Sequence, residues 1–237
     1  MKRAWIIAVA GLMVSFIATS SPAQDWPRVP MPSEVRAFDI AQSITLNAMP
    51  MRLQGFVSSM PADKLVELFR RSMGSPLVES RLGAQRILGR MQGEFYVSVQ
   101  IEPAGHGSRG TTAVTHLKAA LDGREAALRE REEWTSRLLP GSRVLSETNS
   151  RDGAKLSRHL VFVNGYGESS NREQLKKLLQ QDGLALQWEG RPGDALFFKS
   201  GAMQGAEPKE AIATIHQGDD GRTTVVLNVV TQLKAPQ

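Results

Sequence analysis

An internal repeat constrains the fold of this chain more than any other feature of its sequence. Two segments share the pattern apolar residue, amide, glycine, aromatic residue at positions 110 apart: Leu53-Gln54-Gly55-Phe56 and Val163-Asn164-Gly165-Tyr166. At the same spacing, each copy continues with apolar residues placed as on one face of a helix, namely Leu65, Leu68 and Phe69 and then Leu175, Leu178 and Leu179. Chance similarity of two strand-rich stretches is the alternative, but order, spacing and element type agree, so we expect two related units.

The repeat extends to the end of each copy with a change of spacing. Thr115-His116-Leu117-Lys118 matches Thr231-Gln232-Leu233-Lys234 at 116 positions, which indicates an insertion in the second copy around residues 201–208. Each copy reads as a strand, a helix and then further strands. We therefore predict an α+β fold of two tandem related modules, each an antiparallel sheet with one packed helix (β-α-β-β-β-β), joined by a helical linker.

The expected elements follow from the periodicity of each copy. In the first copy we predict a helix over 61–73, opened by Pro61 and Asp63, and strands over 47–57, 76–82, 85–91 and 94–102. In the second copy Ser170 and Glu173 form a capping box that opens the helix, and strands are expected over 185–189, 195–200, 211–216 and 223–230. Glycine-rich segments before the last strand of each copy predict hairpin turns.

Two segments lie outside the copies. The first carries Pro27, Pro30 and Pro32 and reads as an extended tether. The second is a charged helix over 122–139, which Pro140-Gly141 ends. The predicted organisation is a signal peptide at 1–23, a Pro-rich tether at 24–45, a first α+β repeat at 46–118, a helical linker at 119–150 and a second α+β repeat at 151–237.

The N-terminus has the pattern of a secretory signal peptide. Lys2 and Arg3 precede an apolar run over residues 4–17, and small residues follow it. Ser21 and Ala23 suit the −3 and −1 positions, so we expect cleavage between Ala23 and Gln24. An uncleaved anchor is the alternative, but the run of 14 residues is shorter than the roughly 20 that span a bilayer. The expected location is the periplasm, with further secretion left open, and no stable membrane span after cleavage.

Composition excludes several classes of function. The chain contains no cysteine, which excludes a lipidated cysteine, disulfides, thiolate metal sites and a cysteine nucleophile. Its formal net charge is +5, but the basic residues are interspersed with carboxylates rather than gathered in a block. We therefore expect no nucleic-acid partner.

The residues that usually perform catalysis or hold metals are not arranged in recognisable motifs. The four histidines, His106, His116, His159 and His216, lack the short spacings of metal ligands. The glycine-rich segments 105–110 and 165–170 lack the Gly-x-Ser-x-Gly arrangement of a serine hydrolase. We predict no catalytic, cofactor-binding or metal-binding residues, and a protein that is not an enzyme.

One stretch is a candidate anion-binding site. Within 21 residues it contains a single acid, Glu79, and five arginines: Arg70, Arg71, Arg81, Arg86 and Arg90. Arginine suits phosphates and anionic glycans because its planar guanidinium binds them bidentately. The alternative is a solvated basic face whose arginines pair with acids elsewhere in the fold.

These observations favour a non-enzymatic periplasmic protein that binds other envelope proteins, such as an accessory of a secretion or pilus-assembly apparatus. Free strands at the edges of its sheets would recruit partner strands by augmentation. One alternative is a periplasmic binder of an anionic small molecule or glycan, through the arginine stretch or the cleft between the units. A hydrolase without a recognisable motif is another.

Overall fold

The computed structural model describes residues 25–191, 195–200 and 207–233, and the predicted signal peptide lies outside them. Within these residues the chain forms twelve strands and four helices. In chain order the elements are β1 (Arg36–Leu46), β2 (Met49–Ser58), α1 (Ala62–Met73), β3 (Val78–Leu82), β4 (Gln85–Gln92), β5 (Phe95–Ala104), β6 (Gly107–His116), α2 (Leu117–Asp122), α3 (Arg124–Ser136), β7 (Arg143–Asp152), β8 (Lys155–Asn164), α4 (Glu168–Gln181), β9 (Leu184–Glu189), β10 (Ala195–Ser200), β11 (Lys209–Gln217) and β12 (Thr223–Gln232).

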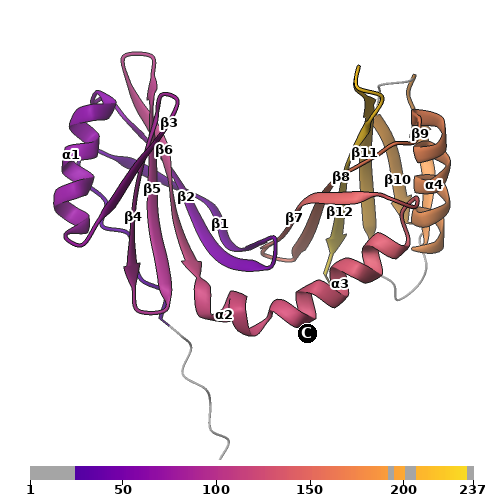
Figure 1. Ribbon diagram of the computed structural model, residues 1–237, viewed down its shortest axis with the longest axis horizontal. Coiled ribbons are helices and arrows are strands. Elements are labelled where there is room, and N and C mark those ends of the chain that lie inside the picture. The colour runs from indigo at the N-terminus through magenta and orange to yellow at the C-terminus, as the bar shows by residue number, and fades with distance from the viewer. Residues whose placement is uncertain (1–24, 192–194, 201–206, 234–237) are drawn as a thin grey trace, which may run out of the picture.

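All twelve strands belong to one antiparallel sheet, in the order β3-β4-β5-β6-β2-β1-β7-β8-β12-β11-β10-β9. Counted outward from the β1–β7 junction, the strands of the two halves follow in equivalent order: β1-β2-β6-β5-β4-β3 on one side and β7-β8-β12-β11-β10-β9 on the other. We call β1–β6 with α1 the first wing, and β7–β12 with α4 the second wing. The sheet bends at the junction into a saddle, with α1 and α4 on the outer flanks and α2 and α3 beneath the centre (Figure 1). The α+β class with a mostly antiparallel sheet agrees with the prediction.

Each wing has its own core between its strands and its helix. In β5 the buried residues Phe95, Val97, Val99 and Ile101 alternate with half-buried ones, because successive side chains of a strand point to opposite faces. They pack against the buried face of α1, where Phe69 is fully covered. Covering each such side chain contributes about 1.5–3 kcal/mol. The second core forms in the same way around α4, and the two clusters share no residue.

The junction between the wings is a short ladder. β1 and β7 pair at only three positions, from Ile44 with Ser150 to Leu46 with Thr148. The turn after β1 adds two hydrogen bonds: the Asn47 N–H donates to the Glu147 carbonyl over 2.8 Å, and the Glu147 N–H donates to Asn47 Oδ1 over 3.0 Å. The wings are therefore continuous in backbone pairing but separate in packing.

The predicted tether over 24–45 is wrong. Residues 36–45 belong to β1, and the residues before them lie along the first core instead of extending from it. Trp26 packs on Phe95 with ring centroids 5.2 Å apart, and the Arg52 guanidinium lies 4.8 Å from the Trp26 ring. The prolines do favour an extended chain, but the apolar residues between them have a core to cover, so the segment forms a strap over the first wing.

The helix expected over 122–139 is found as α3, Arg124–Ser136, but the predicted helical linker over 119–150 is wrong in its extent. A separate helix, α2, precedes α3 and meets it at Gly123, and β7 begins at Arg143 inside that range. The sequence of β7 is mostly polar, since much of it lies at the junction rather than over a core, so it lacks the apolar alternation that signals a strand.

The spacing of equivalent elements differs from the predicted alignment near the start of each copy. β2 ends at Ser58 and β8 at Asn164, and α1 begins at Ala62 and α4 at Glu168, so both pairs are 106 positions apart. The sequence alignment at 110 was displaced by about one helical turn. At the other end, Ser108 of β6 pairs with Ser58 and Thr223 of β12 pairs with Asn164, so these last strands are related at 115 positions and the alignment at 116 was displaced by one residue.

The expected capping box of the second helix is wrong. The N-cap of α4 is Gly167, and no side chain caps the helix. Asn171 instead donates hydrogen bonds from its amide nitrogen to the carbonyl oxygens of Tyr166 and Gly167, each over 3.1 Å. This buried asparagine fastens the loop to the first turn of the helix and replaces the reciprocal bonds of Ser170 and Glu173.

Candidate binding surfaces

The five arginines of the predicted anion site lie on α1 and on the neighbouring strands β3 and β4. Arg70 and Arg86 both reach Glu79, with nitrogen–oxygen distances of 2.5 and 3.4 Å. Arg86 also lies 3.4 Å from Asp63. The set therefore includes two arginines that share a carboxylate, as the alternative interpretation of the stretch expected.

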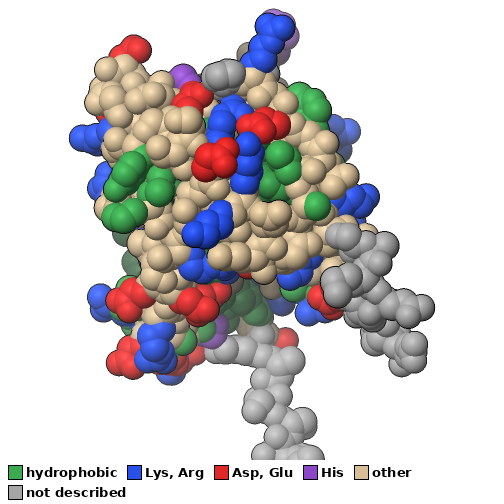
Figure 2. All heavy atoms as spheres, turned by 90° about the vertical axis from the view of Figure 1, so that its right-hand side faces the viewer, with side chains coloured by type: hydrophobic (Ala, Val, Ile, Leu, Met, Phe, Trp, Pro, Cys, Tyr) green, Lys and Arg blue, Asp and Glu red, His purple; other side chains and the backbone are tan. Residues whose placement is uncertain are grey.

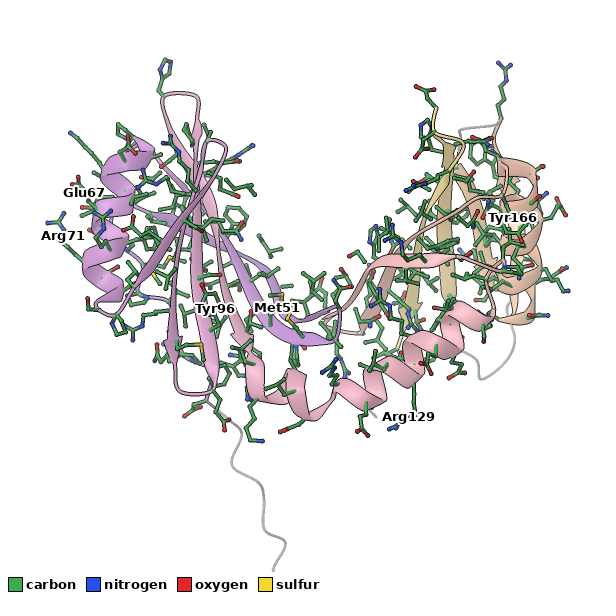
Figure 3. The ribbon with its side chains drawn as sticks, in the orientation of Figure 1. Met51, Glu67, Arg71, Tyr96, Arg129 and Tyr166 are labelled. Carbon is green, nitrogen blue, oxygen red and sulfur yellow. The ribbon has the colours of Figure 1, made fainter. Side chains whose placement is uncertain are left out.

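The other three arginines bind backbone carbonyls rather than one common site. Arg71 Nε donates to Glu67 over 3.4 Å, Arg81 Nε donates to Gly83 over 3.2 Å, and Arg90 donates to the carbonyl of Met73. Figure 3 places Arg71 on the outer side of α1, beside Glu67. Anion binding by Arg70, Arg71, Arg81, Arg86 and Arg90 remains a prediction.

The two edge strands are fastened to their helices by corresponding acids. Arg70 donates to Glu79 of β3, and this bond together with the nearby positive charges lowers the pKa of Glu79 below its usual range. In the second wing, Lys176 of α4 lies 2.9 Å from Glu189 of β9 and lowers the pKa of that carboxyl in the same way. Both carboxylates are thus held ionised on the helix-bearing face of the sheet.

The opposite, concave face of the sheet carries no helix of the described residues (Figure 1). Strand register assigns side chains to this face, because paired residues lie on the same side and neighbours along a strand on opposite sides. In the first wing a row of paired residues crosses five strands and consists of Met91, Tyr96, Thr115, Met51 and Ile44. Figure 3 shows Tyr96 and Met51 on these strands.

The second wing presents an apolar row on the same face. Ile212, Phe197 and Trp188 are paired across β11, β10 and β9. The neighbours of Ile212 along β11, Ala211 and Ala213, are buried in the core, so Ile212 points the other way and is 48% exposed. Trp188 is 54% exposed at the edge strand. Exposed apolar side chains that are grouped rather than scattered mark binding surfaces.

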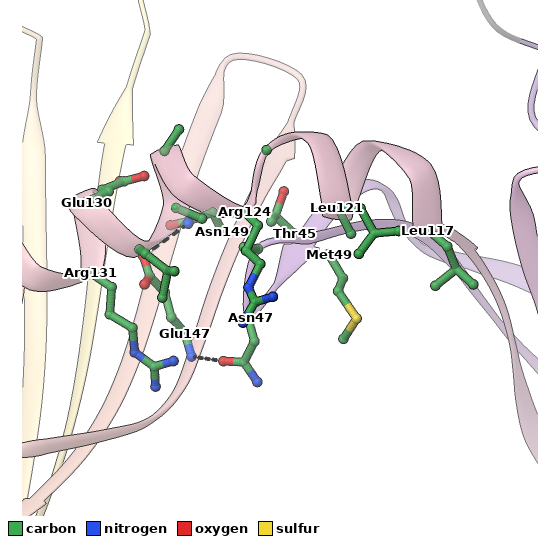
Figure 4. Close-up of a pocket in the computed structure, with 16 residues that line it drawn as sticks. Thr45, Asn47, Met49, Leu117, Leu121, Arg124, Glu130, Arg131, Glu147 and Asn149 are labelled. Carbon is green, nitrogen blue, oxygen red and sulfur yellow. Dashed lines mark hydrogen bonds between the residues drawn. The ribbon is translucent and has the colours of Figure 1, made fainter.

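A groove lies on the other side of the junction. It is bounded by α2 and α3, which we call the bridging helices or the bridge, and by the hairpin of β1 and β2, which we call the central hairpin. The volume of the groove is about 770 Å³. Leu117 and Leu121 of α2 and Leu128 of α3 contribute apolar wall, opposite Met49 of the hairpin (Figure 4). Neither helix buries a side chain fully. The two helices therefore connect the wings but leave the space between themselves and the sheet open.

The polar residues of the groove are unequally neutralised. Glu147 and Glu130 both bind Arg158, Glu130 over 3.2 Å. Arg131 donates to the Val144 carbonyl over 2.6 Å. In the part of the chain that the structure describes, neither Arg131 nor Arg124 has a carboxylate within salt-bridge distance. Local positive charge thus remains beside an apolar wall.

A second hollow of about 500 Å³ adjoins the groove, and Thr45 and Asn149 line both. Its wall combines Trp134 and Leu156 with charged residues such as Arg158. The Arg158 guanidinium lies 4.5 Å from the Trp134 ring, so this end of the space is already occupied by a stacked cation.

The residues considered for chemistry are dispersed. His116, His159 and His216 lie in strands, and among the described residues no group of three or more acids and histidines is placed to hold a metal ion. The outer face of the second wing carries acidic and basic side chains side by side (Figure 2). No helix in the described part of the chain is long and apolar enough to cross a membrane. Sequence reasoning missed the groove because most of its wall comes from the range 119–150, which was expected to be a helical linker, while Asn47, Met49 and Leu117 come from the first repeat.

Comparison of the chain with protein-family models, with curated proteins and with solved structures finds no match.

Proposed function

We propose that the mature chain is a non-enzymatic periplasmic protein that binds other envelope proteins through the concave face of its sheet. The observation that supports this most is the pair of apolar rows on a face without a covering helix, one around Met91 and one around Ile212. Apolar patches of this kind on a monomer are typical of protein-binding surfaces. Accessory components of secretion or pilus-assembly machines belong to this class.

The proposal includes a duplicated origin for the two wings. Equivalent strand orders outward from the junction and the shared position of Glu79 and Glu189 support it. Two related wings at an angle present two similar patches to one elongated partner, and the binding of the second patch then becomes intramolecular. A partner segment that lies across the concave face would contact both patches.

In vivo photo-cross-linking tests the proposal. A photoreactive amino acid is placed at Ile212 or at Met91 on the concave face, and in a matched control at Lys177 on the exposed side of α4. We expect the concave positions to cross-link a reproducible set of envelope proteins, identified by mass spectrometry, that the control does not capture. Substitution of Ile212 by serine should weaken capture from Met91 because it removes apolar contact area. The same proteins at all three positions, or none at the concave ones, would refute the proposal.

A further inference from the structure

We propose that the groove between the bridging helices and the central hairpin binds a single-chain anionic amphiphile of the long-chain fatty acid type. The acyl chain lies along the leucines of α2 and α3, and the head group binds Arg124. This site lies on the other side of the sheet from the concave face, so the inference is independent of the proposed function.

The apolar wall of the groove favours an aliphatic chain. Leu121 is 70% exposed and Leu128 is 47% exposed, although both lie on helices that cross the middle of the molecule. The remaining wall between them consists largely of alanine side chains and Gly123. Leucine and alanine surfaces provide contact area without hydrogen bonds, which suits a hydrocarbon chain better than a glycan.

The charges of the groove favour an anionic head group. Glu130 and Glu147 are both bound by Arg158, whose single charge offsets one of their two, and with Arg124 and Arg131 the site has three arginines against two carboxylates. Arg124 points from the first turn of α3 into the space toward Asn47 (Figure 4). Since Arg124 has no acidic partner among the described residues, a carboxylate beside it would gain a charge-assisted hydrogen bond without breaking an existing ion pair.

The size and shape of the space agree with such a ligand. A volume of about 770 Å³ falls within the range of small-molecule pockets, roughly 300–1,000 Å³. Helices α2 and α3, which meet at Gly123, line the groove from Leu117 to Arg131, and at 1.5 Å per residue their combined length over this range is about 20 Å. A long acyl chain has a comparable length, so with its head at Arg124 it can cover the leucines.

Competition for a fluorescent fatty acid tests the proposal directly. Mature protein, residues 24–237, is loaded with dansyl-labelled undecanoic acid, and displacement is measured with oleate, with the neutral methyl oleate and with acetate. Arg124→Gln removes the proposed head-group contact. Arg129→Gln is the matched control, since Arg129 lies on the same helix but points away from the sheet (Figure 3). Leu121→Gln tests the apolar wall.

We expect oleate to displace the probe below its critical micelle concentration, and methyl oleate and acetate to do so much more weakly. Arg124→Gln should weaken oleate about tenfold, the effect of losing one charge-assisted hydrogen bond. Leu121→Gln should also weaken it, and Arg129→Gln should not. Because all three side chains are exposed, thermal unfolding should be unchanged in each variant. Absence of displacement by oleate, or equal affinity of the Arg124→Gln and Arg129→Gln variants, would overturn the inference.

Discussion

Replacing Asn171 by leucine tests whether the buried amides of the second wing determine its stability. Asn171 is 2% exposed, and its Oδ1 accepts a hydrogen bond from Asn164 Nδ2 over 2.8 Å. Its own Nδ2 has Asn164 Oδ1 and the carbonyls of Tyr166 and Gly167 within 3.1 Å. Leucine has nearly the same shape but removes one acceptor and one donor from Asn164 and the amide donor from the Tyr166 carbonyl.

The expected cost of this substitution follows from the number of bonds lost. One amide can make two donor bonds at a time and accepts one here, and each contributes about 1 kcal/mol net. The desolvated amide of Asn164, which keeps only its bonds to Ser142 and to the Tyr166 N–H, adds to the loss. We therefore expect Asn171→Leu to lower the free energy of unfolding by about 3 kcal/mol.

A double-mutant cycle distinguishes a coupled network from two independent side chains. In Asn164→Leu/Asn171→Leu the two amides are removed together, so neither remains buried opposite an apolar partner. The double variant should be more stable than the sum of the single effects predicts, by about 1–2 kcal/mol. Urea unfolding of residues 24–237, followed by circular dichroism, measures each variant, and Gln180→Leu on the exposed side of α4 is the control. Two outcomes would show that the network reasoning is wrong. One is that the effects of the two substitutions add, and the other is that the free energy of unfolding of Asn171→Leu lies within about 0.5 kcal/mol of the wild-type value, which is less than one hydrogen bond contributes.

Three further predictions concern the strap, the junction turn and the edge strands. Trp26→Ala should lower the free energy of unfolding by about 2 kcal/mol, because it uncovers the first core. Its control, Trp188→Ala on the open face, should change the free energy of unfolding by less than about 0.5 kcal/mol. Equal effects of the two substitutions in thermal melts would exclude a packing role for the strap. Ala48 has a φ of 67°, which glycine adopts without a steric penalty, so Ala48→Gly should raise the free energy of unfolding by about 0.5–1 kcal/mol in urea titrations, and a loss would contradict this. The pKa of Glu79 is lowered by Arg70, so this carboxylate stabilises the fold above its unfolded pKa and less so as the pH falls through its folded pKa. The small deficit of Glu79→Gln should therefore shrink as the pH falls below the ordinary pKa of glutamate, about 4.3, and a deficit constant with pH would argue against the ion pair.

Sequence periodicity predicted the elements that lie over a core. α1 and α4 each bury an apolar stripe, and β12 buries Val225 and Leu227 on one face, so their patterns are strong. The class of the fold and most element bounds in both wings followed from these segments.

Elements away from the cores could not be recognised in this way. β7 has a mostly polar sequence because part of it lies at the junction, and its pairing with β1 depends on residues about 100 positions away. β1 was hidden by the prolines that precede it. The groove is built from these two strands, from α2 and α3, and from the turn that leads into β2, and the sequence marks none of its residues as a ligand-binding group; it indicates Arg124 only as part of a charged helix.

The arginine stretch illustrates a different limit. Sequence proximity placed five arginines together and noted one acid, but only the fold brings Asp63 within 3.4 Å of Arg86. Register also directs Arg81 and Arg86 to the helix-bearing side of the sheet and away from the open face. Charge density along a sequence therefore overstated the charge available to a ligand.

The short junction has a consequence for the order in which the chain folds. All strands of the first wing pair among themselves except at the three positions that join β1 to β7, so this wing is complete once residue 116 has been synthesised. The second wing must wait much longer, because β8 pairs along its whole length with β12, near the end of the chain. Until Thr223–Gln232 is made, the second core remains open at the strand that carries Val225 and Leu227. The nascent protein therefore combines a finished half with an open one, and the unfinished half is the one with exposed apolar surface to protect from aggregation.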